Sequence, residues 1–305
     1  MELFVIGNGF DLGHNLETTY SDFRDYLENT NEVFLMELEQ MYGFSNDSDK
    51  KLVKEYLWKD FENNLSSIEE TNIIEAGETI DLGLEIEDMG IEDTLSSHWE
   101  NQYGFIKELN EFVMSWIGEI DINIPKKTKL INKCKDDMFI TFNYTLVLEK
   151  VYGIDTSKIL HIHGSIEEDD LDPVIGHGNK QKVIENRQIA YEAREQFYEK
   201  KCSIYNAIAN YYERTLKNVE SFIGINNYFF RELKNINTIS IIGHSLGDVD
   251  IPYFKEIKNY VNKNTIWKFY CYDENNSEYY KKKLMSIGID SNNIIIKKSC
   301  DFFCK

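Results

Sequence analysis

Two neighbouring stretches decide the fold: DDMFITFNYT at residues 136–145 and ILHIHGSI at residues 159–166. In each of them a short apolar run, at 138–141 and at 159–163, predicts a β-strand that gives way to small and polar residues. In an open α/β sheet, ligands bind where the carboxyl ends of the strands meet their loops. The sequence therefore predicts a functional site at the ends of these two strands.

Three side chains with useful chemistry stand at these predicted strand ends. Asn143 follows the first strand, and His161 and His163 lie two residues apart on the second, so both rings are expected on one face of the sheet. The alternative is that Asn143 caps a helix and that the histidines are hydrogen-bonded core residues. The coincidence of an amide and two imidazoles favours a site. His177, between two glycines, either returns to this site or only turns the chain.

The amino terminus supplies a second part of the predicted site. A strand at residues 2–6 runs directly into GNGFDLG at residues 7–13, which is how a dinucleotide-binding fold begins. Glycines allow a tight turn and close approach of the backbone to a pyrophosphate, which a helix amino terminus attracts. The third glycine comes one residue later than in Gly-x-Gly-x-x-Gly. Asp11, beside the second glycine, is more readily explained as a helix cap than as a ligand contact.

Further apolar runs complete the predicted sheet, at 238–242, 266–272 and 294–297. The intervening residues 17–130 and 180–233 carry apolar side chains at helical spacing. We therefore predict an α/β fold over residues 1–305, with one Rossmann-like parallel sheet in a single domain. Two large, mainly helical insertions should interrupt it at 17–130 and 180–233.

Charge and composition exclude several classes of protein. The 305 residues carry a formal net charge of −20, which disfavours extended nucleic-acid binding but allows a small anionic ligand. There is no basic leader and no apolar run long enough to span a membrane, so we expect a cytoplasmic protein. The five cysteines are scattered and form no Cys-x-x-Cys pair. The acidic segment 60–104 lacks Lys and Arg, and we interpret it as a solvated face or a mobile segment and assign it no chemistry.

A further motif, GHSLG at residues 243–247, matches the nucleophile elbow of serine hydrolases and follows a predicted strand. The order of residues argues against Ser245 as a nucleophile. In α/β-hydrolases the catalytic histidine follows the serine, whereas no histidine lies beyond His244 in this chain. A triad in another order, with His161 or His163, stays a minor alternative.

Four motifs, in this order and rough spacing, resemble those of the sirtuins. They are GNGFD at 7–11, TFNYT at 141–145, HIHGS at 161–165 and IGHSL at 242–246. In this particular wording they are similar to AbiH-type phage abortive-infection proteins, a divergent sirtuin-like group. The resemblance covers the α/β core and not the helical insertions.

The resemblance implies an NAD pocket on a sirtuin-like sheet, with Asn143 and His163 at the catalytic positions. It implies nucleotide contacts by further motif residues: Gly7, Asn8, Gly9, Phe10, Asp11, Thr141, Thr145, His161, Gly243, His244 and Ser245. Two departures weaken the expected nicotinamide contact, because Phe142 replaces the sirtuin glutamine and Thr145 replaces its aspartate. The paired zinc cysteines are absent, so we expect neither zinc nor protein deacetylation.

We hypothesise an anti-phage effector that hydrolyses NAD to nicotinamide and ADP-ribose. Asn143 would orient water or a ribose hydroxyl, and His163, of a residue type with a pKa near 6.5, would be the general base. The alternative is a non-catalytic module that senses NAD or ADP-ribose, as a homo-oligomer or with a defence-system partner. A metal site at His161, His163 and Asp11 has the His-x-His spacing but lacks a further ligand.

Overall fold

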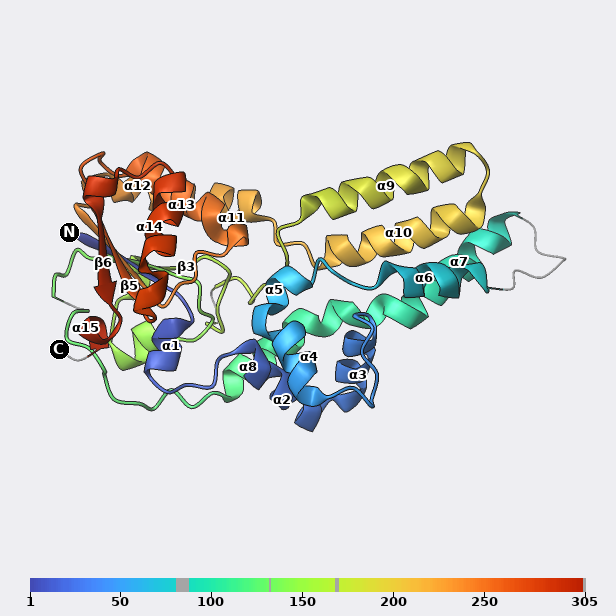
Figure 1. The fold of residues 1–305 in the computed structure, drawn as a ribbon, viewed down its shortest axis with the longest axis horizontal. Helices are drawn as coiled ribbons and strands as arrows, with labels where there is room; N and C mark the ends of the chain where they lie inside the picture. The colour runs from blue at the N-terminus through green and yellow to red at the C-terminus, as the bar shows by residue number, and fades with distance from the viewer. Residues whose placement is uncertain (81–87, 132, 168–169, 304–305) are drawn as a thin grey trace. The chain divides into compact units, whose positions relative to one another are not determined.

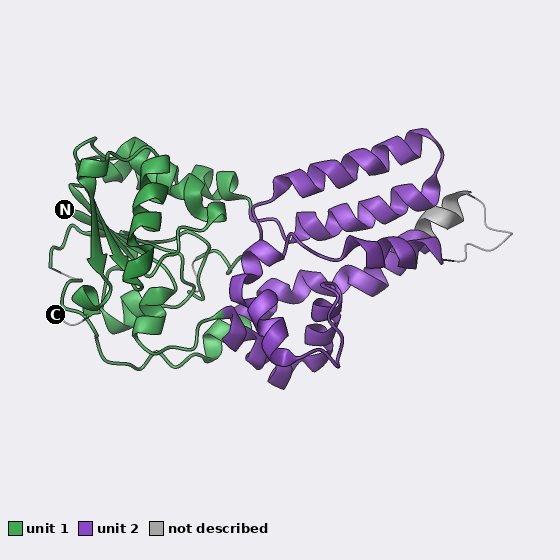
Figure 2. Cartoon of the chain, viewed as in Figure 1, with its two compact units in different colours: residues 1–19, 114–174, 218–305 green, residues 20–113, 175–217 purple. Residues whose placement is uncertain are grey.

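A computed structural model of the chain describes residues 1–80, 88–131, 133–167 and 170–303, without the side chains of 88–93. The chain divides into two compact units, and neither is continuous in sequence (Figure 2). Unit 1 comprises residues 1–19, 114–174 and 218–305, and unit 2 comprises residues 20–113 and 175–217.

Unit 1 contains a six-stranded sheet in the order β3-β2-β1-β4-β5-β6. The strand bounds are Glu2–Ile6 (β1), Met138–Thr141 (β2), Ile159–His161 (β3), Thr238–Ile242 (β4), Ile266–Cys271 (β5) and Ile294–Lys298 (β6). All neighbouring strands are parallel. The predicted parallel α/β fold is confirmed, and the strand order is typical of Rossmann-like folds.

Both faces of the sheet are apolar, as is usual for parallel sheets that helices cover on two sides. Successive side chains alternate between the faces, so Val5 belongs to one buried cluster and Ile6 to the other. The register extends these rows across the sheet, because Val5 pairs with both Ile140 and Ile241.

Helices cover each face of the sheet (Figure 1). On the face of Val5 they are α11 (Val219–Ile225), α12 (Asn227–Glu232), α13 (Ile251–Tyr260) and α14 (Ser277–Ser286). On the face of Ile6 they are α1 (Gly9–Gly13), the π-helical turn η3 (Val147–Val151) and α15 (Cys300–Phe303). We call these the α13 face and the α1 face.

Strand β3 ends earlier than the sequence predicts, and this moves one histidine. The strand stops at His161, and a turn follows in which Gly164 has a φ of 80° and its N–H bonds to the carbonyl of His161. His161 therefore contacts Glu149 of η3 on the α1 face, whereas His163 contacts Tyr253 on the α13 face. The expectation that both rings share one face is wrong.

Unit 2 is built of helices. Their bounds are Tyr20–Thr30 (α2), Glu32–Gln40 (α3), Lys50–Tyr56 (α4), Phe61–Asn64 (α5), Glu70–Glu78 (α6), Asp88–Tyr103 (α7), Lys180–Glu195 (α9) and Glu199–Arg214 (α10). Helix α8 (Leu109–Glu119) runs from unit 2 into unit 1. Residues 81–87 of the acidic segment 60–104 lie outside the described residues. No helix in the described part of the chain is long and apolar enough to cross a membrane.

The turns that follow β1 and β4 touch backbone to backbone. The N–H of Gly9 donates to the carbonyl of Gly243 at 2.8 Å. A Cβ on Gly243 would lie 2.2 Å from the backbone nitrogen of Phe10, and the φ of Gly243 is +67°. Glycine at this position is therefore required twice, by backbone conformation and by space.

Alanine at Gly243 should destabilise unit 1 by about 3 kcal/mol or more, because left-handed strain adds to a steric clash. Gly153 is the matched control, since its φ is +71° and a Cβ there would meet nothing within 4 Å. Gly153→Ala should cost only about 1 kcal/mol. Urea unfolding of both variants measures the difference. Equal losses would show that the contact between the two turns contributes nothing.

Candidate functional site

A buried polar cluster lies at the carboxyl ends of β1 and β2, made by Asp11, Asn143 and Thr145. The hydroxyl of Thr145 donates to Oδ2 of Asp11 at 2.6 Å, and Nδ2 of Asn143 donates to the carbonyl of Gly7 at 3.3 Å. Asp11 is 1% exposed and Asn143 is 7% exposed. Asp11 lies within α1 and does not cap it, and η3 is preceded by Leu146, so the capping explanations of Asp11 and Asn143 are wrong.

Two oxygens of this Asp11–Asn143–Thr145 cluster have no donor among the described residues. They are Oδ1 of Asp11 and Oδ1 of Asn143, both fully buried. Leaving a buried acceptor without a hydrogen bond costs about 1–3 kcal/mol. The cluster thus has hydrogen-bonding capacity that the folded chain does not use, and a ligand with O–H or N–H groups could satisfy it.

Burial raises the pKa of the Asp11 carboxyl to about 6, although hydrogen bonds from Thr145 and Asn143 act in the opposite direction. A carboxyl that titrates near neutral pH is suited to accept a proton in general base catalysis. Asp11 therefore has chemistry that its sequence context did not reveal.

His161 holds the backbone of Asn143 in place. Its Nδ1 bonds to the carbonyl of Asn143 at 3.0 Å, and its Nε2 bonds to Oε1 of Glu149 at 2.8 Å. Burial lowers the pKa of His161, but the Glu149 carboxylate more than offsets this and the pKa is raised overall. Both ring nitrogens are occupied, so His161 positions Asn143. Sequence reasoning missed Glu149. The one feature of the sequence that could have indicated it is an acidic residue directly after two apolar ones, Val147 and Leu148.

A second polar group lies on the α13 face, and we call it the histidine–aspartate cluster: His163, His244, Asp250 and Tyr253. Nε2 of His163 lies 3.2 Å from the hydroxyl of Tyr253 and 3.8 Å from Oδ1 of Asp250. Nε2 of His244 lies 3.3 Å from Oδ2 of the same carboxylate. One aspartate therefore faces two imidazoles. Sequence reasoning did not place these two residues at the site, where Asp250 belongs to the turn η6 (Asp248–Asp250) and Tyr253 to the first turn of α13.

The ring of Phe142 separates the two histidines of this cluster. Its centroid lies 5.3 Å from that of His163 and 4.3 Å from that of His244, in both cases edge to face. The N–H of Leu246 donates to Nδ1 of His244 at 2.8 Å, so the proton of the neutral ring is on Nε2, toward Asp250. Phe142 is thus an apolar spacer between the two imidazole rings.

The remaining predicted residues of the glycine turn serve the fold. The N–H of Gly7 donates to the carbonyl of Ile242 at 2.9 Å, and that of Gly9 is used by Gly243. Asn8 exchanges hydrogen bonds with Thr18, and Phe10 is completely buried. The close approach that these glycines allow is made to another turn of the chain.

The structure also shows where Ser245, Thr141 and His177 lie. Ser245 is exposed, and no hydrogen bond joins it to a histidine among the described residues, so the geometry gives no support to a serine hydrolase. Thr141 is buried, and its hydroxyl accepts the N–H of Asn143 at 3.1 Å. His177 belongs to unit 2, where its ring bonds to the carbonyl of Tyr212 at 3.0 Å. His177 only turns the chain.

The described residues contain no group of three or more His, Cys, Asp or Glu side chains that could hold a metal ion. His161 and His163 face opposite sides of the sheet, so they do not converge on one ion.

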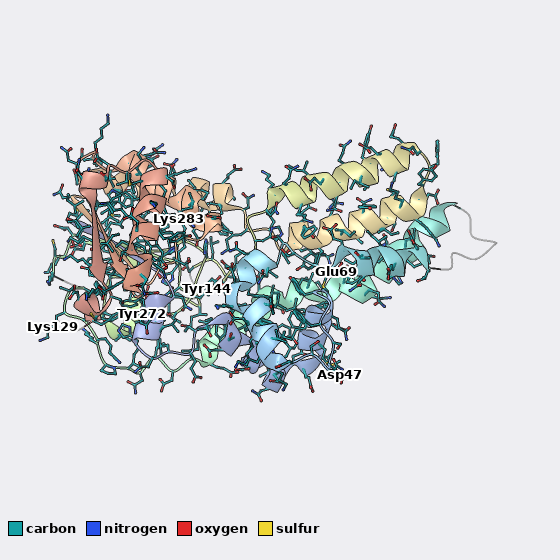
Figure 3. All side chains as sticks on the ribbon, viewed as in Figure 1. Asp47, Glu69, Lys129, Tyr144, Tyr272 and Lys283 are labelled. Atoms are coloured by element: carbon teal, nitrogen blue, oxygen red, sulfur yellow. The ribbon has the colours of Figure 1, made fainter. Side chains whose placement is uncertain are left out.

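Two groups that sequence reasoning missed lie near the ends of β4 and β5. Tyr272 follows β5 and is 95% exposed. Nζ of Lys283, on α14, lies 3.0 Å from Oδ1 of Asp248 in the turn after β4; Figure 3 labels Tyr272 and Lys283. The carboxyl ends of β4 and β5 thus have an exposed aromatic ring and an ion-paired lysine nearby.

Replacing Glu149 with glutamine should cost about 2 kcal/mol at pH 6, because a charge-assisted buried bond becomes a neutral one. The raised pKa of His161 means that its pairing stabilises the fold fully below pH 6.5 and is lost as the pH rises through that pKa. The difference between wild type and variant should therefore shrink above pH 6.5. Urea unfolding between pH 6 and 9 measures it, and a constant difference would contradict the charged pairing.

Asp11→Asn should raise the free energy of unfolding at pH 7 by about 2 kcal/mol, because the pKa shift from 3.8 to about 6 disfavours the buried charge. The wild type should lose this stability as the pH rises from 4 to 6, and the variant should not. Thermal unfolding of both proteins across this interval tests the sign. A less stable variant at pH 7 would show that the charge is stabilising.

The chain matches the sequence model of a known protein family. A family model described as "Bacteriophage abortive infection AbiH" matches residues 3–271, from β1 to the end of β5. Comparisons with curated proteins and with solved structures gave no match. The match contains all four motifs, and it extends beyond the α/β core over the helical segments, which the resemblance did not cover. The chain therefore belongs to the AbiH family of bacteriophage abortive infection.

Proposed function

We propose that this protein acts in abortive infection by binding a nucleotide of the NAD class and hydrolysing it to nicotinamide and ADP-ribose. Membership of the AbiH family supports the biological role. The chemical part of the proposal is carried by one observation: Oδ1 of Asp11 and Oδ1 of Asn143 are buried acceptors to which no described residue donates.

The two acceptors fit a ligand with two neighbouring hydroxyl groups. Asp11 and Asn143 are close enough for the amide to lower the pKa of the carboxyl. A ribose diol has two O–H donors on adjacent carbons and would satisfy both oxygens. The strand order reverses between β1 and β4, and nucleotides bind Rossmann-like sheets at that switch point. Ribose near Asn143 would also put its glycosidic carbon beside this cluster.

Hydrolysis breaks the bond between the ribose C1′ and the nicotinamide nitrogen, and the bonding electrons leave with neutral nicotinamide. Water then adds to C1′, and its proton must be accepted. Asp11, with its pKa near 6, can accept that proton at neutral pH. His163 is the other candidate base, but it lies on the α13 face beside Asp250 and Tyr253, so we favour Asp11.

If Asp11 is the base, Asp11→Asn should lower kcat by about 10²–10⁴-fold and leave NAD affinity largely unchanged. Asn143→Ala should lower both kcat and the affinity for NAD, because an acceptor proposed to bind the ligand is lost. Asp47→Asn is the matched control, the same substitution at an exposed site in unit 2 (Figure 3). The measurements are nicotinamide release by chromatography and NAD binding by calorimetry.

Together with His163→Ala, these variants and the wild type distinguish the remaining alternatives. A wild-type protein that binds NAD without releasing nicotinamide would be a non-catalytic sensor. Loss of activity in His163→Ala together with full activity in Asp11→Asn would assign the base to His163. A wild-type protein that neither binds nor cleaves NAD would overturn the proposal.

A further inference from the structure

Unit 2 contains a cavity of about 840 Å³ that plays no part in the proposed nucleotide site. Residues of α7, α9, α10 and the α9–α10 turn line it, and every one of them belongs to unit 2. A volume of this size is within the range of ligand-binding pockets in proteins, about 300–1,000 Å³. The lining includes aromatic rings and charged side chains on exposed helix ends.

Phe197, in the turn between α9 and α10, is the most unusual residue of the lining. Its φ is +60°, a conformation that disfavours side chains and that glycine usually adopts at a helix end. Its ring is 89% exposed. The described chain thus gains little from this ring, either in backbone conformation or in packing. The turn itself is an ordinary helix end, because the N–H of Tyr198 donates to the carbonyl of Ala193 at 2.9 Å, so it is the large exposed ring that is unusual here.

Two further rings extend the aromatic surface. Trp99 and Tyr103 of α7 stack with their centroids 5.8 Å apart and an angle of 20° between the rings. Nε1 of Trp99 donates to Oγ of Ser203 at 2.7 Å, which fixes the indole. The cavity therefore has a rigid aromatic wall on α7 and the exposed ring of Phe197 at α10.

The charges of the lining favour a cationic occupant. Glu195 and Glu199 make no ion pair among the described residues, whereas Arg214 is paired with Glu100 at 3.1 Å. Arg194 is the one lining cation outside an ion pair in the described part of the chain, so free carboxylates outnumber free cations. The net charge of −20 also attracts basic partners. Aromatic faces next to carboxylates bind ammonium and guanidinium groups.

We propose that this cavity is a docking site for a basic peptide segment of a partner protein. A lysine or arginine side chain of the peptide lies against the ring of Phe197, and Glu195 and Glu199, which flank this residue in the lining, neutralise it. The site is separate from the Asp11–Asn143–Thr145 cluster, so it does not depend on the nucleotide proposal. The chain then has one unit for chemistry and another for recognition of a partner.

The test uses the full chain and fluorescein-labelled peptides KFKFK and EFEFE, with anisotropy as the readout. KFKFK should bind and EFEFE should not, and raising NaCl from about 50 to 500 mM should weaken the binding through screening. Phe197→Gly should weaken KFKFK binding by at least about tenfold. Its melting temperature should stay the same or rise, because glycine suits the left-handed conformation.

Tyr191→Ala is the matched control, since Tyr191 is an exposed ring on α9 that does not line the cavity. This variant should bind KFKFK as wild type does. Glu199→Gln is a second variant, which removes one negative charge from the lining, and it should weaken KFKFK binding several-fold. Failure of KFKFK to bind, equal binding of EFEFE, or full binding by Phe197→Gly would each overturn the proposal.

Discussion

The contact between the β1 and β4 turns is the constraint on which the rest of unit 1 depends. Strand order reverses between these strands, so their connections leave the sheet toward opposite faces. A hydrogen bond of 2.8 Å from the N–H of Gly9 to the carbonyl of Gly243 joins the two turns. Because backbone fills the gap, polar side chains are displaced to either side of it. Asp11 and His244 therefore belong to separate groups.

The two groups lie on opposite faces of the sheet because consecutive side chains after β2 point in opposite directions. Phe142 and Asn143 are consecutive, yet Phe142 packs between the rings of the histidine–aspartate cluster while Asn143 turns toward Asp11. Each group contains an acid beside residues that can donate or accept a proton. In the Asp11 group two acceptor oxygens have no hydrogen-bond donor among the described residues, and in the other group His163 lies beside Tyr253 while His244 accepts the N–H of Leu246.

Local sequence was enough to predict the parallel sheet, because each strand is an apolar run bounded by small or polar residues. It was also enough to predict family membership, since that depends on the order of short motifs. The positions of His161 and His163 could not be predicted from their spacing, because the turn at Gly164 ends β3 before His163. Glu149 and Tyr253 could not be predicted either, since only tertiary structure brings them to the histidines. The cavity of unit 2 depends on how helices meet, which helical periodicity does not describe.

The discontinuous path of the chain has a consequence for how the protein forms at the ribosome. Strand β1 is synthesised first, but Leu3 pairs with Met138 and Ile239, which emerge far later. The whole of unit 2 is synthesised before β4, so its helices can assemble while the central strand of the sheet still lacks a neighbour. Pairing over such long loops is slow and leaves strand edges open to aggregation. A nascent chain arrested before β4 is therefore a candidate substrate for chaperones, with the helical unit complete and the sheet unfinished.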